Sequence, residues 1–204
     1  MMAAPDISCS PRIGQVVAAV RRLFMRYGYR RTSIDDIARE AGLSKATLYL
    51  YFASKEDMFR AMIRQFREVV IDRCDAAEGL AAPIAARVAE LIYASHGTAL
   101  EWFGDAEHIR EVKTFAADHP LDDVRGNDRL AFQARLERLL TEAGGTRELD
   151  FGRSTTNARE VATVLMFAAH GAKNGSFSGV EDYRSILNVI VRLILGPIST
   201  GVIP

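Results

Sequence analysis

The chain has 204 residues, of which 49% are hydrophobic and 25% charged, an ordinary globular composition that argues against intrinsic disorder. Its formal net charge is zero, which by itself does not favour binding to nucleic acid. Residues 1–60, however, hold ten Lys or Arg against six Asp or Glu, and residues 61–204 hold sixteen against twenty, so a basic first part suited to phosphate precedes an acidic body.

Helical periodicity dominates the chain, and no stretch alternates apolar and polar residues for long enough to predict a sheet. The first helix is expected to begin at Ser10 and Pro11, because Ser caps helices and Pro suits the first helical position. It is expected to end at Gly28. Its inner face is one apolar stripe at helical spacing, formed by Ile13, Val16, Val17, Val20, Phe24 and Tyr27.

Two short helices follow the first one. Ser33 and Asp36 have the spacing of a capping box, which predicts a helix over residues 34–41, and Gly42 makes the turn after it. A third helix is predicted from Ser44 to about residue 52. The two helices and the turn between them form the pattern of a helix-turn-helix.

A long fourth helix begins where Ser54 and Asp57 repeat the capping pattern, and it extends to about residue 77 before Gly79 and Pro83. About twenty-four residues in helical conformation form a rod of roughly 36 Å. This rod is expected to join the two halves of the protein.

Further helices are predicted over about 83–103, 105–117, 125–143, 156–173 and 180–195, separated by segments rich in Gly, Pro and Asn. The expected fold is therefore all-α, with about nine helices. Its predicted division is a three-helix DNA-binding domain over residues 1–57, followed by a helical ligand-binding and dimerisation domain over residues 58–204.

Residues 32–55 read TSIDDIAREAGLSKATLYLYFASK, and with the preceding LFMRYGYRR they closely resemble the N-terminal domain of the TetR family of bacterial repressors. The resemblance covers about the first 60 residues; beyond them, only the helical layout is similar. It implies a cytoplasmic transcriptional repressor whose second short helix enters the major groove of double-stranded DNA.

The direction of each side chain on the third helix follows from about 100° per residue. With Leu48 and Phe52 as the inward pair, Ala46 and Leu50 point outward, away from the core. These two residues and Thr47 are the predicted base readers. The predicted phosphate and backbone contacts complete the DNA-binding set: Ser33, Ser44, Lys45, Tyr49, Tyr51 and Lys55. Arg30 and Arg31 either reach phosphate as well or are solvated surface.

The outward pair is apolar, whereas the family often has Gly at the first of these positions and a polar or aromatic residue at the second. Apolar side chains cannot pair with guanine or adenine edges, but they can contact the C5-methyl group of thymine. We therefore expect the operator to carry thymine opposite Ala46 and Leu50.

The last helix is apolar around most of its circumference, because only Asn188 and Arg192 are polar among the ten residues from Ile186 to Leu195. Such a helix must be buried on more than one side. A two-fold homodimer in which the last two helices form a four-helix bundle satisfies this requirement, as in TetR relatives, and predicts a near-palindromic operator. A monomer with one buried helix is the alternative. The predicted interface consists of Val161, Val164, Leu165, Ala168, Ile186, Leu187, Ile190 and Ile194.

Aromatic and histidine side chains lie between the bundle and the N-terminal domain. In the family such residues line an apolar effector cavity, whereas in any helical protein they also serve as core. The predicted lining is Tyr93, His96, Trp102, Phe103, His108, Phe115 and Phe132. The resemblance implies that a small ligand, expected to be lipophilic, tilts the fourth helix and releases the operator.

Other functional classes receive less support from the sequence. No catalytic motif surrounds the four histidines, so no enzymatic activity and no cofactor are expected. Glu107, His108 and Glu111 have a spacing that permits metal binding, but a solvated helix face explains them better, and no metal is expected. A regulator that responds to a protein partner, or that activates transcription, stays open.

The cysteines and the N-terminus indicate the compartment. Cys9 and Cys74 are too few for a disulfide framework and match no zinc spacing, which fits a reducing cytosol. Residues 1–10 carry no positive charge of the kind that precedes a secretory signal, and no apolar run approaches bilayer length. We therefore expect a soluble, cytoplasmic protein without a membrane partner.

Overall fold

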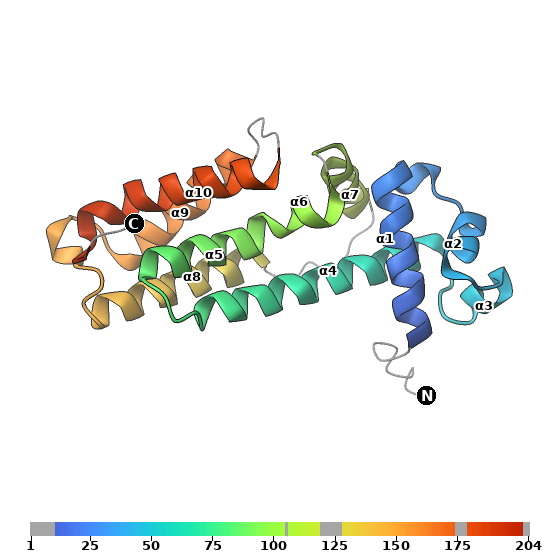
Figure 1. Ribbon diagram of the computed structural model, residues 1–204, viewed down its shortest axis with the longest axis horizontal. Coiled ribbons are helices and arrows are strands. Elements are labelled where there is room, and N and C mark those ends of the chain that lie inside the picture. The colour runs from blue at the N-terminus through green and yellow to red at the C-terminus, as the bar shows by residue number, and fades with distance from the viewer. Residues whose placement is uncertain (1–10, 105, 119–127, 174–178, 202–204) are drawn as a thin grey trace. The chain divides into compact units, whose positions relative to one another are not determined.

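A computed structural model describes residues 11–104, 106–118, 128–173 and 179–201. These residues are almost entirely helical, which confirms the all-α prediction (Figure 1). Besides the helices, they contain two 3₁₀ turns, η2 (Phe151–Arg153) and η3 (Gly196–Ile198), and one isolated bridge between Leu149 and Ser199. The α-helices are α1 (Pro11–Arg31), α2 (Ile34–Ala41), α3 (Lys45–Tyr49), α4 (Lys55–Glu78), α5 (Ile84–His96), α6 (Thr98–Phe103), α7 (Ala106–Asp118), α8 (Asp128–Gly145), α9 (Ala158–Lys173) and α10 (Val180–Leu195).

Local capping signals match the structure closely. The Ser33 hydroxyl accepts a hydrogen bond from the Asp36 amide, and the Asp36 carboxylate accepts one from the Ser33 amide, so the predicted capping box is formed. Gly42 ends α2 in the left-handed region, with φ of 65°. The Asp57 amide donates to the Ser54 hydroxyl at the start of α4. The predicted cap of the first helix, Ser10, lies outside the described residues.

Two predicted helices differ in extent from those in the structure. α3 ends at Tyr49 and continues only as a turn, so it is shorter than predicted. The single helix expected over 83–103 is two helices, because the chain breaks at Gly97. The Tyr93 ring lies where a side chain on Gly97 would start, and the Thr98 hydroxyl donates to the Ala94 carbonyl. Both contacts join residues four positions apart, so they are local to this stretch of the chain.

Gly28 interrupts α1, as predicted, although the helix resumes as far as Arg31. Its φ of 78° lies in the left-handed region, which a residue with a Cβ adopts only at a cost. The Glu111 carboxylate of α7 lies against Gly28 and accepts a hydrogen bond from the Arg30 amide, with Arg30 N to Glu111 Oε1 at 3.0 Å. The broken end of α1 is therefore held by α7.

The chain forms two compact units. Unit 1 comprises Met1–Glu68 and Trp102–Val124, and unit 2 comprises Val69–Glu101 and Arg125–Pro204. α4 and α6 each cross from one unit to the other. This grouping differs from the division predicted at residues 57 and 58, because α7 packs on α1 although it is remote in sequence.

Aromatic rings fill the core of unit 1. Phe24 of α1 lies 5.4 Å from Phe59 of α4, and Phe59 lies 4.3 Å from Phe115 of α7, measured between ring centroids. The same core holds Trp102, Phe103 and His108. Four of the residues predicted to line the effector cavity, Trp102, Phe103, His108 and Phe115, pack in unit 1.

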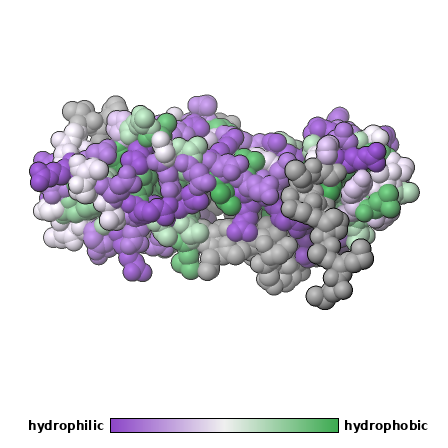
Figure 2. Space-filling view, turned by 90° about the horizontal axis from the view of Figure 1, so that it is seen from below, coloured by the Kyte–Doolittle hydropathy of each residue, from purple (hydrophilic) through white to green (hydrophobic). Residues whose placement is uncertain are grey.

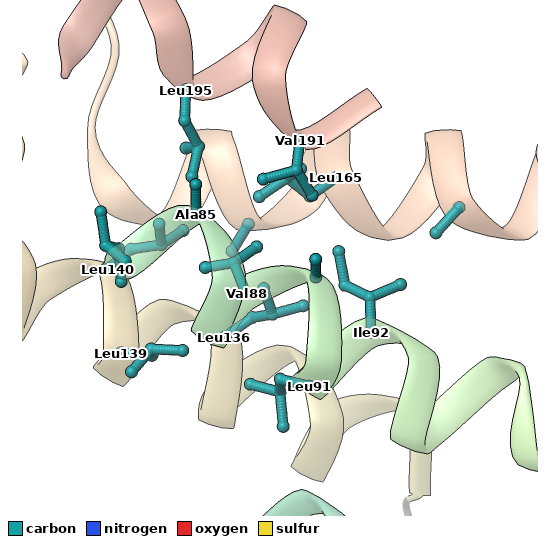
Figure 3. Packing of buried hydrophobic residues seen from close by; sticks show 14 of the residues in the cluster. Ala85, Val88, Leu91, Ile92, Leu136, Leu139, Leu140, Leu165, Val191 and Leu195 are labelled. Atoms are coloured by element: carbon teal, nitrogen blue, oxygen red, sulfur yellow. The ribbon is translucent and has the colours of Figure 1, made fainter. Parts of the chain in front are cut away.

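Aliphatic side chains fill the core of unit 2, where α5, α8, α9 and α10 pack together (Figure 3). Figure 3 shows Leu165 of α9 and Val191 of α10 directed toward the side chains of α5. Three residues predicted at the dimer interface, Val161, Leu165 and Leu187, belong to this core and are almost completely buried within one chain.

His96 ends α5 next to the break at Gly97, with its ring 5.2 Å from that of Phe132. Burial, with a smaller contribution from the Lys173 charge, lowers the pKa of His96 from 6.5 to about 4. The folded protein therefore keeps this imidazole neutral at pH values where the unfolded chain binds a proton.

Stability is thus expected to fall as the pH drops from about 6.5 to about 4, because the unfolded state takes up a proton that the folded state excludes. The loss is on the order of 3 kcal/mol at most and ends below about pH 4, where both states are protonated. Denaturant unfolding across this range measures it. His96→Gln should flatten the dependence. An unchanged slope in His96→Gln contradicts the assignment.

Candidate nucleic-acid interface

α2, the turn at Gly42 and α3 form the predicted helix-turn-helix within unit 1. Leu48 anchors α3, because its side chain is completely buried. Ser44 caps α3: its hydroxyl accepts a hydrogen bond from the Thr47 amide at 3.0 Å and lies 2.8 Å from the Thr47 hydroxyl. Both hydroxyls are therefore used locally, and Thr47 is half-buried.

The outer side of α3 is exposed and largely apolar. Leu50 is 80% exposed and Tyr49 is 51% exposed, and Ala46 is exposed as well. Figure 2 shows hydrophobic atoms on the α2–α3 side of unit 1. A leucine exposed to this extent buries little apolar surface within its own chain and so contributes little to folding.

Lys45 lies at the start of this surface. Its ammonium pairs with the Asp35 carboxylate of α2, with Lys45 Nζ to Asp35 Oδ1 at 2.6 Å, and both side chains are exposed. The hydrogen bond with Asp35 raises the pKa of Lys45, so the group stays charged. Surface ion pairs of this kind are weak, and a phosphate can replace Asp35 as the partner.

Lys55, a predicted phosphate contact, is half-buried and already has partners within unit 1. Its ammonium donates to the carbonyls of Tyr29 and Thr32, at 2.7 and 2.8 Å, and lies 4.2 Å from the centre of the Tyr29 ring. Burial lowers the pKa of Lys55. Lys55 therefore ties the start of α4 to the segment between α1 and α2.

Two methionine variants separate these lysines. Lys55→Met leaves two carbonyls without their donor and should lower the free energy of unfolding by about 2 kcal/mol, with the salt dependence of DNA binding unchanged. Lys45→Met should leave unfolding nearly unchanged and reduce the slope of log K against log salt by about one unit per half-site. Thermal unfolding and duplex titrations at several salt concentrations measure both effects. A reduced slope of log K against log salt in Lys55→Met would instead indicate that Lys55 contacts a DNA phosphate.

The remaining predicted contacts occupy less open positions. The Ser33 hydroxyl also donates to the Asp36 carboxylate, and these bonds lower the pKa of Asp36, so Ser33 serves first as a cap. Tyr51 is half-buried and lines a cleft of about 610 Å³ with residues of α1 and α4, including Ile13 and Arg64.

Unit 2 exposes an apolar surface on α9 and α10. Val164, Phe167 and Leu193 are 53%, 61% and 69% exposed. Four predicted interface residues are half-buried on the same helices: Ala168, Ile186, Ile190 and Ile194. Phe167 and Leu193 were not among the predicted interface residues. When a helix is apolar on nearly every side, its sequence does not show which side packs into the core of its own chain and which side is exposed.

A cleft of about 470 Å³ in unit 2 includes Tyr93, one of the predicted effector residues. The Arg184 guanidinium stacks over the Tyr93 ring, 3.5 Å from its centre, and pairs with Glu90 at 2.6 Å. The Tyr93 hydroxyl donates to Glu101, and burial and Glu101 raise the pKa of Tyr93 to about 12. This charged lining does not match the predicted lipophilic ligand. His96 and Phe132 lie in unit 2 as well, packed against each other.

Two further absences concern the described residues alone. They include no helix both long and apolar enough to cross a membrane. They also contain no group of three or more His, Cys, Asp or Glu arranged to hold a metal ion. Of the three predicted metal-binding alternatives, Glu111 binds the Arg30 amide, and the Glu107 side chain lies outside the described residues.

Residues 16–62 match the family model described as bacterial regulatory proteins, tetR family. Among curated relatives, the uncharacterized HTH-type transcriptional regulator YfiR of Bacillus subtilis is 38% identical over 52 residues, which are 26% of this chain and 25% of that protein. The HTH-type transcriptional regulator RutR of Escherichia coli is 34% identical over 71 residues, 35% of this chain and 34% of that protein. The matches to these relatives thus span a quarter to a third of their length.

Solved structures share the fold along nearly the whole chain. A TetR transcription regulator from Haloarcula marismortui matches with a TM-score of 0.72 and 18% identity, covering 93% of this chain and 98% of that one. A regulator from Saccharomonospora viridis, solved in complex with choline, matches with a TM-score of 0.70 and 22% identity, covering 88% and 95%. At this level of identity the likeness concerns the fold.

Proposed function

This chain belongs to the TetR family of bacterial regulatory proteins, and on that premise we propose that it is a sequence-specific transcriptional regulator that binds a near-palindromic operator as a homodimer. The observation that carries the proposal is the exposed outer side of α3, where Leu50, Tyr49 and Ala46 lie open on a helix anchored by buried Leu48. The first-turn amides of α3 and the Lys45 charge suit adjacent phosphates. No catalytic role is part of the proposal.

Selection of duplex fragments by the purified protein tests this function directly. We expect the recovered sequences to share two inverted half-sites, with centres one helical turn of about 34–36 Å apart or a multiple of it, because a two-fold dimer presents α3 twice. Lys45→Met should weaken binding to selected and unselected duplexes alike. Recovery of no common sequence, with no measurable affinity for any duplex, overturns the proposal.

Within each half-site, we propose that Leu50 and Ala46 contact thymine methyl groups, since both side chains are exposed and apolar. Replacing the facing thymines with uracil removes only the methyl groups and should weaken binding several-fold. Leu50→Ala should remove most of the difference between the thymine and uracil operators. Equal affinity of the wild type for both operators contradicts this mode of readout.

We further propose that the protein is a repressor released by a small effector that binds the Tyr93 cleft of unit 2. The paired charges of Arg73 with Glu101 and of Arg184 with Glu90 suit a polar or charged ligand better than an aliphatic one. Choline chloride and sodium decanoate are suitable opposing probes, one cationic and one lipophilic. Choline should raise the melting temperature and weaken operator binding more than decanoate does, and the reverse order contradicts the proposed cleft.

A further inference from the structure

A second cleft, of about 630 Å³, lies in unit 1 between the broken end of α1 and α7. Four arginines line it: Arg26, Arg30, Arg31 and Arg110. All four are exposed, and no carboxylate of the described residues lies within ion-pair distance of any of them. The nearby carboxylate, Glu111, accepts its hydrogen bond from a backbone amide. We call these four arginines the basic band.

The basic band continues toward the helix-turn-helix. Arg26 and Arg31 also line an adjoining cleft whose other wall is α2, including Asp36 and Arg39. The preceding residue, Asp35, pairs with Lys45 at the start of α3. A connected surface therefore runs from α7, past the first turn of α2, to the proposed recognition helix.

The arginines at the far side of this surface differ from the basic band. Arg22 pairs with Glu40 at 2.6 Å, and Arg39 pairs with Asp36, so their charges are already compensated within unit 1. The four arginines of the basic band, by contrast, have no ion-pair partner among the described residues. Guanidinium groups bind phosphate oxygens through paired N–H donors.

We propose that the basic band binds phosphates of the operator duplex outside the bases that α3 reads. This inference rests on the proposed function. An extended polyanion fits the arrangement better than a compact anion, because the guanidiniums are distributed over two adjoining open clefts and the band is continuous with the α2–α3 surface. Duplex DNA carries one charge per about 1.7 Å of its axis, which matches a row of exposed arginines.

Two duplexes test the proposal: one ends at the edge of the selected palindrome, and the other extends by a helical turn of about 10 base pairs on each side. Wild-type protein should bind the longer duplex more tightly, with a steeper salt dependence. The double variant Arg30→Gln, Arg110→Gln should reduce the slope of log K against log salt by about 3 to 4 units per dimer on the longer duplex, at about 0.9 per phosphate. Binding to the shorter duplex should change little.

The matched control is Arg129→Gln, Arg159→Gln, which removes the same charge from exposed positions in unit 2 and should preserve the dependence on flanking DNA. Unfolding curves of both double variants should coincide with that of the wild type, since neither Arg30 nor Arg110 makes an ion pair with the residues that the structure describes.

Three outcomes overturn the inference. In one, the wild type binds both duplexes equally; in another, the band variant and the control lose the same affinity. In the third, the band variant no longer binds free tripolyphosphate but still binds the longer duplex more tightly than the shorter one. That result would indicate that the cleft binds a small anion and not the flanking DNA. If the wild type binds neither duplex, the proposed function itself fails, and that result is distinct from loss of the flanking effect alone.

Discussion

Replacing Phe167 with glutamate should separate the proposed dimer into monomers and lower the affinity for the full operator by about 10²- to 10⁴-fold. Phe167 is 61% exposed on α9, and Leu193 is 69% exposed on α10. In a two-fold bundle of α9 and α10, each substitution would place a carboxylate in an apolar interface, where burial of an unpaired charge is strongly unfavourable. The affinity loss follows because a monomer loses the effective concentration that links two half-sites.

Light scattering after size-exclusion chromatography measures the mass, and titration with one- and two-half-site duplexes measures the affinity. Leu130→Glu is the matched control, because Leu130 is 55% exposed on α8, outside the proposed interface. It should leave both mass and affinity unchanged. A dimeric Phe167→Glu protein, or equal effects of the two variants, contradicts the proposed interface.

Leu165→Ala should instead lower the free energy of unfolding by about 3 kcal/mol, within the 2–5 kcal/mol typical of a large-to-small change in a core. Leu165 lies two residues before Phe167 on the same helix, yet it is completely buried among residues of α5, α8 and α10 (Figure 3). The substitution removes apolar contacts and leaves a cavity within a single chain. The loss of stability is therefore expected within each protomer and not at the dimer interface.

Denaturant unfolding at protein concentrations that differ a hundredfold separates the two origins, since a loss at the interface depends on protomer concentration and a loss in the core does not. Leu130→Ala, at an exposed position, should change stability by less than about 0.5 kcal/mol. A concentration-dependent loss in Leu165→Ala, or dissociation without destabilisation, would return this residue to the interface.

Short-range features of this protein could be predicted from the sequence alone. The capping box of Ser33 and Asp36, the left-handed turn at Gly42 and the extent of α10 all agree with the structure. Each depends on residues a few positions apart, because caps, turns and helical periodicity are interactions within one or two turns of the chain. The outward direction of Leu50 follows from the same periodicity once Leu48 faces inward.

Contacts between remote segments could not be predicted in this way. Lys55 resembles a surface cation in the sequence, but the backbone carbonyls of Tyr29 and Thr32 surround its ammonium in the fold. Arg110 joins the arginines of α1 only because α7 packs on α1.

The two sides of α9 also could not be distinguished from the sequence. Leu165 and Phe167 are equally apolar, so hydrophobicity alone does not assign one to the core and the other to the surface. That assignment depends on where α5, α8 and α10 lie. Periodicity shows that a helix has an apolar face, but it does not show which other helices pack against that face.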